Sequence, residues 1–419
     1  MINKTDVIVI GGGPAGCAAA IGLSRLGYRV VLCDQAKFPR DKVCGEFISP
    51  AADPILARLG VLDRIEALKP KRLKGVAISS YGGEEILVDY PKLPGMQSKP
   101  TSLSVPRYEL DSLLIEETKR AGTVVQEQCK VTDFLFENGC VAGVKGWDAN
   151  KTSFSIRSPL VIDAGGRNSL SLKKFKLKQK PAGKVKIALA AHWQGAQIYD
   201  DYCFMHVSDW GYTGISSIGK DKANVVLVAN RNSMNGEKPH EFYINMLMKN
   251  PLRRKILQDA YCIESVRGVE SLAFSSKPPP CGGLLMVGDA MGFIDPFTGE
   301  GIYLSLRSSE IAVEVAEMAL KNNDLSKDFL KGYVTRRRHE FDKKFLLSRI
   351  LQKLIYSQFF CNRVVKRLKE DRKLAETLVG VIGDLIPADA VVSFKFLFQL
   401  IGGSPSIAEW MKKKVYFCL

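Results

Sequence analysis

The stretch "DVIVIGGGPAGCAAAIGLSRLGYRVVLCDQ", residues 6–35, predicts a strand, a glycine turn, a helix and a second strand. Its opening apolar run is typical of a buried parallel strand. Gly11, Gly13 and Gly16 form a GxGxxG pattern, which allows a tight turn, close approach of a pyrophosphate and close helix packing. Asp34 ends the second strand, where a carboxylate accepts hydrogen bonds from a ribose. We therefore expect an α/β fold with a Rossmann-like dinucleotide-binding domain.

The composition is that of an ordinary globular protein with a large positive charge. Hydrophobic residues make up 46% of the 419 residues and charged residues 25%, which argues against wholesale disorder. The net charge of +16 suggests an anionic partner: nucleic acid, a phosphorylated substrate or a membrane surface. The ten cysteines include no CxxC pair, which argues against metal sites and a disulfide framework. Without room for a signal peptide or a run of ~20 apolar residues, we expect a cytoplasmic protein.

A second motif indicates which dinucleotide binds. Residues 282–320, "GGLLMVGDAMGFIDPFTGEGIYLSLRSSEIAVEVAEMAL", resemble the second FAD fingerprint of the glutathione-reductase-like flavoproteins, especially the p-hydroxybenzoate hydroxylase superfamily. "LVIDAGGRNS", residues 160–169, is similar to a strand and turn of the same superfamily. The resemblance implies that Asp289 binds the ribityl chain. It also implies that a helix beginning near Gly301 directs its positive end at the flavin edge, where reduction places negative charge. We expect FAD as the cofactor.

Three segments together resemble the geranylgeranyl reductase family, whose members reduce isolated double bonds in isoprenoid chains. They are "FPRDKVCGEFISP" (38–50), "SVPRYELDSLL" (104–114) and "GDAMGFIDPFTGEGI" (288–302). The resemblance covers roughly residues 5 to 320 and is most specific in the FAD motifs. It implies a reaction in which hydride from reduced FAD and a proton from a nearby acid are added to an unsaturated carbon pair.

The same resemblance implies roles for single residues. The pair Cys44–Gly45 corresponds to a Cys-Gly pair beside the isoalloxazine. Arg107 corresponds to an arginine near the FAD diphosphate, and Val131 to a strand residue on the adenine side. The expected cofactor-binding residues are Gly11, Gly13, Ala15, Gly16, Asp34, Cys44, Gly45, Arg107, Val131, Asp289, Gly299, Gly301 and Ile302.

Cys44 and Glu46 are the candidate catalytic residues. A thiol beside the flavin could tune it or donate a proton to a carbanion-like carbon, and the alternative is a small packing residue. Glu46 could act as a general acid in an apolar pocket, and the alternative is a surface or capping carboxylate.

Segments 76–100 and 171–275 lie between the FAD motifs and predict an antiparallel substrate sheet that covers the flavin. The FAD domain would then be discontinuous, with residues 1–75, 101–170 and 276–322. Trp210 and Tyr212 are candidate walls of the substrate pocket, or else ordinary core or edge aromatics. The aromatic-proline signature of the reductase family is not reproduced at this place. No second GxGxxG follows, so electrons would come from transiently bound NAD(P)H or from a reduced protein.

Residues 323–419 predict basic helices that either pack on the FAD domain or lie on an anionic membrane surface. Nucleic acid is not favoured, because no recognised binding fold is present. The interpretation is an FAD-dependent oxidoreductase that reduces a C=C bond in a hydrophobic isoprenoid, lipid-like or polyketide-like molecule. The alternatives are an aromatic monooxygenase and a non-catalytic flavin-binding partner. Flavin halogenases carry a WxWxIP signature and a catalytic lysine, and the four separated tryptophans place halogenation lower. The oligomeric state is left open.

Overall fold

A five-stranded parallel sheet forms the centre of the nucleotide-binding half, and the computed structural model describes residues 4–179, 185–199, 201–270, 272–293 and 295–403. The strand order is β21-β12-β1-β2-β8, and every neighbouring pair is parallel. The bounds are β1 Val7–Ile10, β2 Val30–Cys33, β8 Val124–Gln126, β12 Leu160–Asp163 and β21 Leu284–Met286. Helix α1 (Pro14–Arg25) connects β1 to β2 and packs between α4 (Arg107–Arg120) and α8 (Gly301–Lys321). The predicted α/β, Rossmann-like FAD-binding fold is confirmed.

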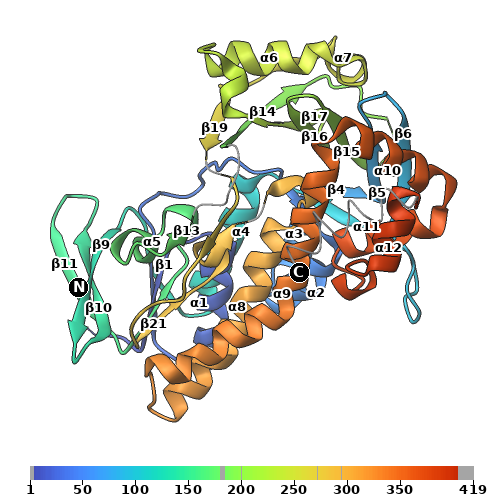
Figure 1. The fold of residues 1–419 in the computed structure, drawn as a ribbon. Coiled ribbons are helices and arrows are strands. Elements are labelled where there is room, and N and C mark those ends of the chain that lie inside the picture. The colour runs from blue at the N-terminus through green and yellow to red at the C-terminus, as the bar shows by residue number, and fades with distance from the viewer. Residues whose placement is uncertain (1–3, 180–184, 200, 271, 294, 404–419) are drawn as a thin grey trace.

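An eight-stranded, mainly antiparallel sheet forms the second half, as Figure 1 shows at the top of the molecule. The order is β18-β14-β17-β16-β15-β5-β6, with β19 also paired to β14, and only β15 and β5 run parallel. The bounds are β5 Gly75–Ser79, β6 Glu85–Asp89, β14 Lys186–Gln194, β15 Tyr202–Ser208, β16 Gly211–Gly219, β17 Lys222–Asn230, β18 Tyr261–Cys262 and β19 Arg267–Glu270. Two separated parts of the chain therefore build this sheet, which we call the substrate sheet after its predicted role. Its outer face is covered by α6 (Pro239–Lys249) and α7 (Pro251–Leu257).

Three small sheets and several short helices complete the two halves. The small sheets have the orders β3-β7-β4, β11-β10-β9 and β13-β20-β22. Their strands are β3 Phe47–Ile48, β4 Lys71–Leu73, β7 Ser102–Ser104, β9 Lys130–Glu137, β10 Cys140–Trp147, β11 Ser153–Arg157, β13 Lys178–Gln179, β20 Phe274–Ser276 and β22 Gly292–Phe293. The short helices are α2 Asp53–Arg58, α3 Leu62–Ala67, α5 Leu170–Lys174, α6 Pro239–Lys249 and α7 Pro251–Leu257. Proline at the first position of α1, α6 and α7 suits a helix start, where its missing N–H costs nothing.

The C-terminal helices pack against both halves. They are α9 Lys327–Ile355, α10 Gln358–Glu370, α11 Arg372–Ile382 and α12 Phe394–Ile401. Helix α9 lies along α8, and α10 to α12 gather beside β5 and β6 (Figure 1). Their apolar residues, such as Leu351 and Leu378, share one core cluster with Val76 and Ile78 of the substrate sheet. Packing on both halves therefore accounts for the amphipathic pattern. No helix in the described part of the chain is long and apolar enough to cross a membrane.

Candidate functional site

A large cavity lies between the two halves of the molecule. It holds about 1430 Å³ of space, solvent at its mouth included. On one side its wall comes from segments that follow β1, β12 and β21, including Pro14, Arg167 and Asp289. On the other side its wall comes from the substrate sheet. Open α/β sheets bind ligands outside the carboxyl ends of their strands, and this cavity is in that position.

The glycine turn forms the dinucleotide end of the site. A Cβ on Gly16 would lie 1.8 Å from the carbonyl oxygen of Gly11, whose own φ is +100°. A Cβ on Gly13 would meet only the Arg40 guanidinium, at 3.8 Å, so Gly13 faces open space that a pyrophosphate can enter. The Asp34 carboxylate accepts hydrogen bonds from the Gly12 N–H at 2.6 Å and from the Ala36 N–H at 2.7 Å. Asp34 therefore also braces the turn.

Charged side chains surround this end of the cavity. The guanidinium of Arg107 forms two hydrogen bonds with the buried Asp111 carboxylate, at 2.9 and 2.8 Å. Arg40 pairs with the same carboxylate at 2.9 Å. Burial raises the pKa of Asp289, while the charges of Lys42, Arg167 and Arg107 oppose that rise.

Together, the four cations Arg40, Lys42, Arg107 and Arg167 outnumber the three carboxylates at the dinucleotide end, which are those of Asp34, Asp111 and Asp289. Lys42 is exposed toward the cavity, yet the protein around it desolvates its ammonium, and this desolvation together with the charge of Arg107 lowers the pKa of Lys42. The positive excess suits the negative diphosphate of a dinucleotide. These residues and the open glycine turn fit FAD.

The start of α8 forms another part of the cavity wall. Gly299 adopts φ +72°, and no atom lies within 4 Å of a Cβ built on Gly301, the first residue of the helix. Ile302 also lines the cavity. The buried Glu300 at the helix start pairs with Lys344 of α9 at 3.0 Å, and Lys344 also contacts Asp384 after α11. The helix terminus that would face the flavin is thus fixed by the C-terminal helices.

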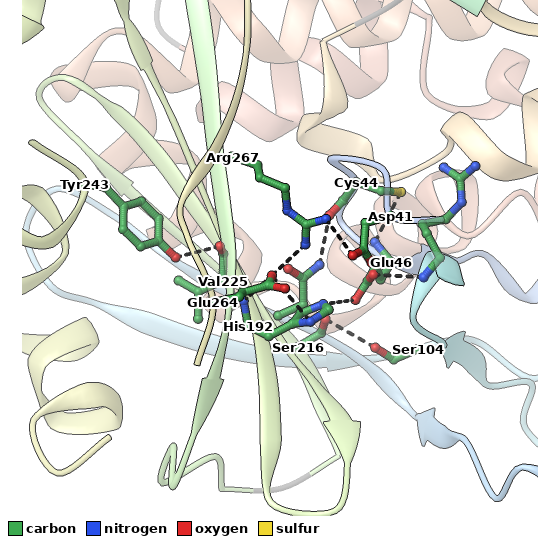
Figure 2. A network of polar contacts seen from close by, with 12 residues as sticks. Asp41, Cys44, Glu46, Ser104, His192, Ser216, Val225, Tyr243, Glu264 and Arg267 are labelled. Atoms are coloured by element: carbon green, nitrogen blue, oxygen red, sulfur yellow. Dashed lines mark hydrogen bonds and ion pairs between the residues drawn. The ribbon is translucent and has the colours of Figure 1, made fainter. Parts of the chain in front are cut away.

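The segment that carries Cys44 enters the site from the loop after β2 (Figure 2). Cys44 and Gly45 line the cavity, and the Cys44 Sγ accepts a hydrogen bond from the Glu46 N–H at 3.3 Å. Glu46 is buried and does not line the cavity. Its carboxylate oxygens accept the Arg107 N–H at 2.9 Å and contact His192 Nε2 at 2.8 Å. This geometry matches the capping alternative rather than a general acid, because both oxygens are engaged away from the cavity.

The substrate end of the cavity is apolar. Its wall includes Val76, Ile78, Ala188, Met205, Val226 and Val228. Tyr212 lines this end, and its hydroxyl donates a hydrogen bond to the buried Asp295 at 2.6 Å. Lys186 also pairs with Asp295, at 2.6 Å. Burial, together with the Asp295 charge, raises the pKa of Tyr212 well above its ordinary value, so Tyr212 stays a neutral wall residue.

Eight of the predicted site residues lie outside the cavity lining. Gly11, Gly13, Gly16 and Asp34 belong to the glycine turn and Glu46 is described above, so three remain: Trp210, Ala15 and Val131. Trp210 is in the turn before β16 and packs on the outer face of the sheet, where the Arg253 guanidinium stacks over its ring at 4.8 Å. Because Trp210 lies in the turn, its side chain does not point to the same face of the sheet as the side chain of Tyr212 in the strand that follows. Tyr212 therefore reaches the cavity and Trp210 does not. Ala15 packs inside α1, where its carbonyl accepts the Ser309 hydroxyl at 2.8 Å. Val131 of β9 packs in a core cluster with Cys33, next to Asp34.

Sequence reasoning missed several residues of the site. Asp111 has a readable signal, because it follows Arg107 by four residues on a predicted helix. His192 and Asn224 have none, since they lie inside apolar strands, 146 and 180 residues from their partners. Arg167 lies in the predicted turn after β12 and lines the cavity, but nothing in the sequence marks it as a site residue.

This fold and site define a flavoprotein with a dinucleotide-binding half and an apolar substrate sheet. The family described as "FAD binding domain" matches residues 4–343, so the chain belongs to that family. It is an FAD-dependent oxidoreductase. Its cofactor site is that of an FAD-binding domain.

Relatives divide between two kinds of enzyme. The 1H-pyrrole-2-carbonyl-(peptidyl-carrier protein) chlorinase of Pseudomonas fluorescens is 28% identical over 368 residues, which are 78% of this chain and 79% of the relative. The digeranylgeranylglycerophospholipid reductase of Methanocaldococcus jannaschii is 26% identical over 417 residues, which are 97% of each chain. The structure of the flavin-dependent brominase Bmp2 superposes with a TM-score of 0.83 at 20% identity, covering 98% of this chain and 100% of that one. The relatives therefore support the FAD-binding family and do not choose between geranylgeranyl reductases and halogenases.

Proposed function

We propose that this protein reduces a carbon–carbon double bond in a hydrophobic, isoprenoid or lipid-like substrate. The observation that carries the proposal is the distribution of charge in the cavity. Among the described residues that line it, the Lys and Arg side chains are Lys42, Arg107 and Arg167, and all three come from the nucleotide-binding half. The wall from the substrate sheet is aliphatic and excludes water from a bound hydrocarbon chain. Halogenases use a catalytic lysine, and none of the described residues that line the cavity from the substrate sheet is a lysine.

Bound and reduced, FAD would supply the hydride for this reaction. The glycine turn and the four cations bind the diphosphate, and Asp289 binds the ribityl chain. The start of α8, at Gly301, stabilises negative charge on the reduced cofactor. The aliphatic wall holds the substrate chain.

Cys44 is proposed as the proton donor, because its side chain lines the cavity at the junction of the two halves. Its thiol proton would pass to the second carbon of the double bond, and the thiolate would take a proton back from solvent. Electrons for the next cycle would come from transiently bound NAD(P)H or a reduced protein.

An anaerobic half-reaction tests this proposal. The purified flavoprotein is reduced without oxygen and mixed with a geranylgeranyl lipid or with its saturated analogue. We expect flavin absorbance to return with the unsaturated lipid alone. If both lipids leave the flavin reduced, the proposal is wrong.

Halogenation is the second candidate, and the chlorinase relative is the observation that favours it. A parallel arm of the same experiment admits oxygen with chloride or bromide and an electron-rich aromatic or pyrrole substrate. A halogenated product would assign the protein to that branch. A hydroxylated product without halide dependence would assign it to the aromatic monooxygenases.

We further propose peripheral contact with anionic lipid through the C-terminal helices. Residues 323–403 contain sixteen Lys and Arg against nine Asp and Glu. Most apolar residues of α10 to α12 are packed in a core cluster, and Phe359 and Phe394 are exposed, so the contact would be mainly electrostatic, with these two rings free to touch the lipid. Such a contact would bring a lipid substrate close to the cavity.

A further inference from the structure

The segment of residues 41–46 belongs to the nucleotide-binding half by sequence, but it is anchored to the substrate sheet. Its fixed points are three contacts, each with a different part of that sheet. Asp41 pairs with Arg267 of β19 at 3.1 Å, the Cys44 carbonyl accepts a hydrogen bond from Asn224 of β17 at 2.9 Å, and Glu46 contacts His192 of β14 at 2.8 Å. Figure 2 shows Asp41 and Glu46 of this segment, close to Cys44, in contact with Arg267 and His192. We call the three contacts the loop clamp.

Glu46 is the innermost of the three anchors. It adopts φ +54°, a left-handed conformation that is unusual for a residue with a side chain, and it is only 4% exposed. One carboxylate oxygen accepts the N–H of Arg107 at the start of α4, and the other faces His192. The same carboxylate therefore links the substrate sheet to the helix whose first residue lines the dinucleotide end.

His192 is itself held in place by neighbouring charged residues. Its backbone N–H donates to Glu264 at 3.0 Å, and its Nδ1 lies 3.5 Å from the same carboxylate. Arg267 pairs with Glu264 at 2.7 Å and with Asp41, and the ring of Tyr108 lies edge-on to the imidazole at 6.5 Å. The carboxylates of Glu46 and Glu264 and the guanidinium of Arg267 thus surround the imidazole. The two negative charges outnumber the one positive charge, which favours the charged imidazolium.

We propose that His192 is a positioning residue, whose imidazolium clamps the Cys44 segment to the substrate sheet and so fixes Cys44 and Arg107 at the cavity. The clamp ties the wall that receives substrate to the loop that would face the flavin. The proposal depends on the proposed function only in treating Cys44 as the proton donor. The loop clamp itself consists of three contacts, and these contacts hold the segment whatever reaction takes place in this cavity.

The direction of the pH dependence follows from the surroundings of His192. Burial opposes the charged imidazole, but the hydrogen bond that His192 donates to Glu46 and the charges of Glu46 and Glu264 outweigh burial and the charge of Arg267, so the pKa of His192 is raised. A raised pKa in the folded state means that the stabilisation is fully present below the ordinary value of about 6.5. It is lost as the pH rises through the raised value. The clamp is therefore closed at acidic and neutral pH and loosens on the alkaline side.

Alkylation of Cys44 in the flavin-bound protein measures the clamp without any turnover. The rate is followed with iodoacetamide and peptide mass mapping between pH 6 and 9 in wild type and in His192→Gln. At pH 6 we expect His192→Gln to label roughly tenfold faster, the scale of a lost charge-assisted hydrogen bond. The two rates should converge as the pH rises through the raised pKa of His192, because the imidazole of the wild type then loses its charge. The control variant is His240→Gln, which replaces an exposed histidine. Its Cys44 should be labelled at the wild-type rate at every pH.

Two further measurements keep the test decisive. If His192→Gln does not fold, Arg267→Gln removes a partly exposed anchor and should still raise the labelling rate, by a smaller factor. His192→Lys keeps a positive charge and should restore slow labelling at pH 9. Equal Cys44 labelling in wild type, His192→Gln and Arg267→Gln across the whole range would overturn the clamp. That result is distinct from a failure of double-bond reduction, because no substrate is added.

Discussion

The two ends of the cavity are built by different means. The dinucleotide end consists of glycines that admit a ligand to the backbone and of buried charges that match a diphosphate. The substrate end consists of aliphatic side chains on a sheet, with one tyrosine held by Asp295. Cofactor binding therefore depends on particular residue types at fixed spacings, whereas the choice of substrate depends on the shape of the cavity wall.

The largest expected effect separates two glycines of the same turn. A Cβ at position 16 would overlap the backbone of Gly11, whereas one at position 13 meets open space. Gly16→Val should lower the free energy of unfolding by about 4 kcal/mol or more and give little folded protein. Gly13→Val should fold but lose FAD, because its side chain occupies the place of the pyrophosphate. Thermal melts and the ratio of flavin to protein absorbance check both, and equal behaviour of the two variants would refute this distinction.

Asp289→Ala tests the charged end next. Removal of this carboxylate leaves Lys42, Arg107 and Arg167 less compensated and takes away the proposed ribityl contact. We expect FAD affinity to fall by about tenfold to a hundredfold, the range for a hydrogen bond to a charged group. Titration of apoprotein with FAD measures it, with exposed Asp209→Ala as the control. Unchanged affinity in Asp289→Ala would remove Asp289 from the cofactor site.

Cys44→Ser and Cys44→Ala probe the junction between the two ends. Both should retain FAD, because the thiol is not among the groups that bind the diphosphate. If the thiol donates the proton, turnover should fall about a hundredfold, the usual scale of general-acid catalysis. Rates within about threefold of wild type, far below that figure, would make Cys44 a spacer.

Gly214→Leu tests the substrate end alone. Gly214 lines the cavity, and a Cβ there would make an ordinary contact with Met205 Sδ at 3.5 Å. The added side chain should fill part of the cavity, at a stability cost of about 1–3 kcal/mol if the wall is well packed. FAD affinity should stay at the wild-type value while KM for a long isoprenoid chain rises about tenfold, as expected for 1–2 kcal/mol of lost contacts. A parallel loss of FAD would show that the two ends are not separable.

The smallest effect concerns the C-terminal helices. Binding to anionic vesicles should weaken steeply as salt rises, because each Lys or Arg near such a surface contributes about 1 kcal/mol. Sedimentation with anionic and with neutral vesicles at low salt is the measurement. Equal binding to both would show that these charges are simply a solvated face.

The sequence predicted the fold and the dinucleotide end well, because glycine turns and strand-end carboxylates keep fixed spacings. Asp34 follows β2 and contacts the glycine turn, as its spacing predicted, and Asp289, which the family resemblance assigned to the cofactor site, lines the cavity. Their contacts with FAD stay predictions. It did not predict the loop clamp, since His192 and Asn224 meet residues 146 and 180 positions away only after the substrate sheet has folded. The face of the sheet to which the Trp210 side chain points depends on where β16 begins. A run of apolar and glycine residues does not specify that start.

The central claim is double-bond reduction, and the mass of the product tests it most directly. The photoreduced protein is incubated without oxygen with a geranylgeranyl lipid in D₂O, and the lipid is analysed by mass spectrometry. Double-bond reduction predicts a lipid that gains two deuterium atoms for each flavin reoxidised, because the N–H hydrogen of the reduced cofactor exchanges with solvent and the added proton also comes from solvent. Unchanged lipid, together with a halogenated product once oxygen and halide are supplied with a suitable aromatic, would contradict it.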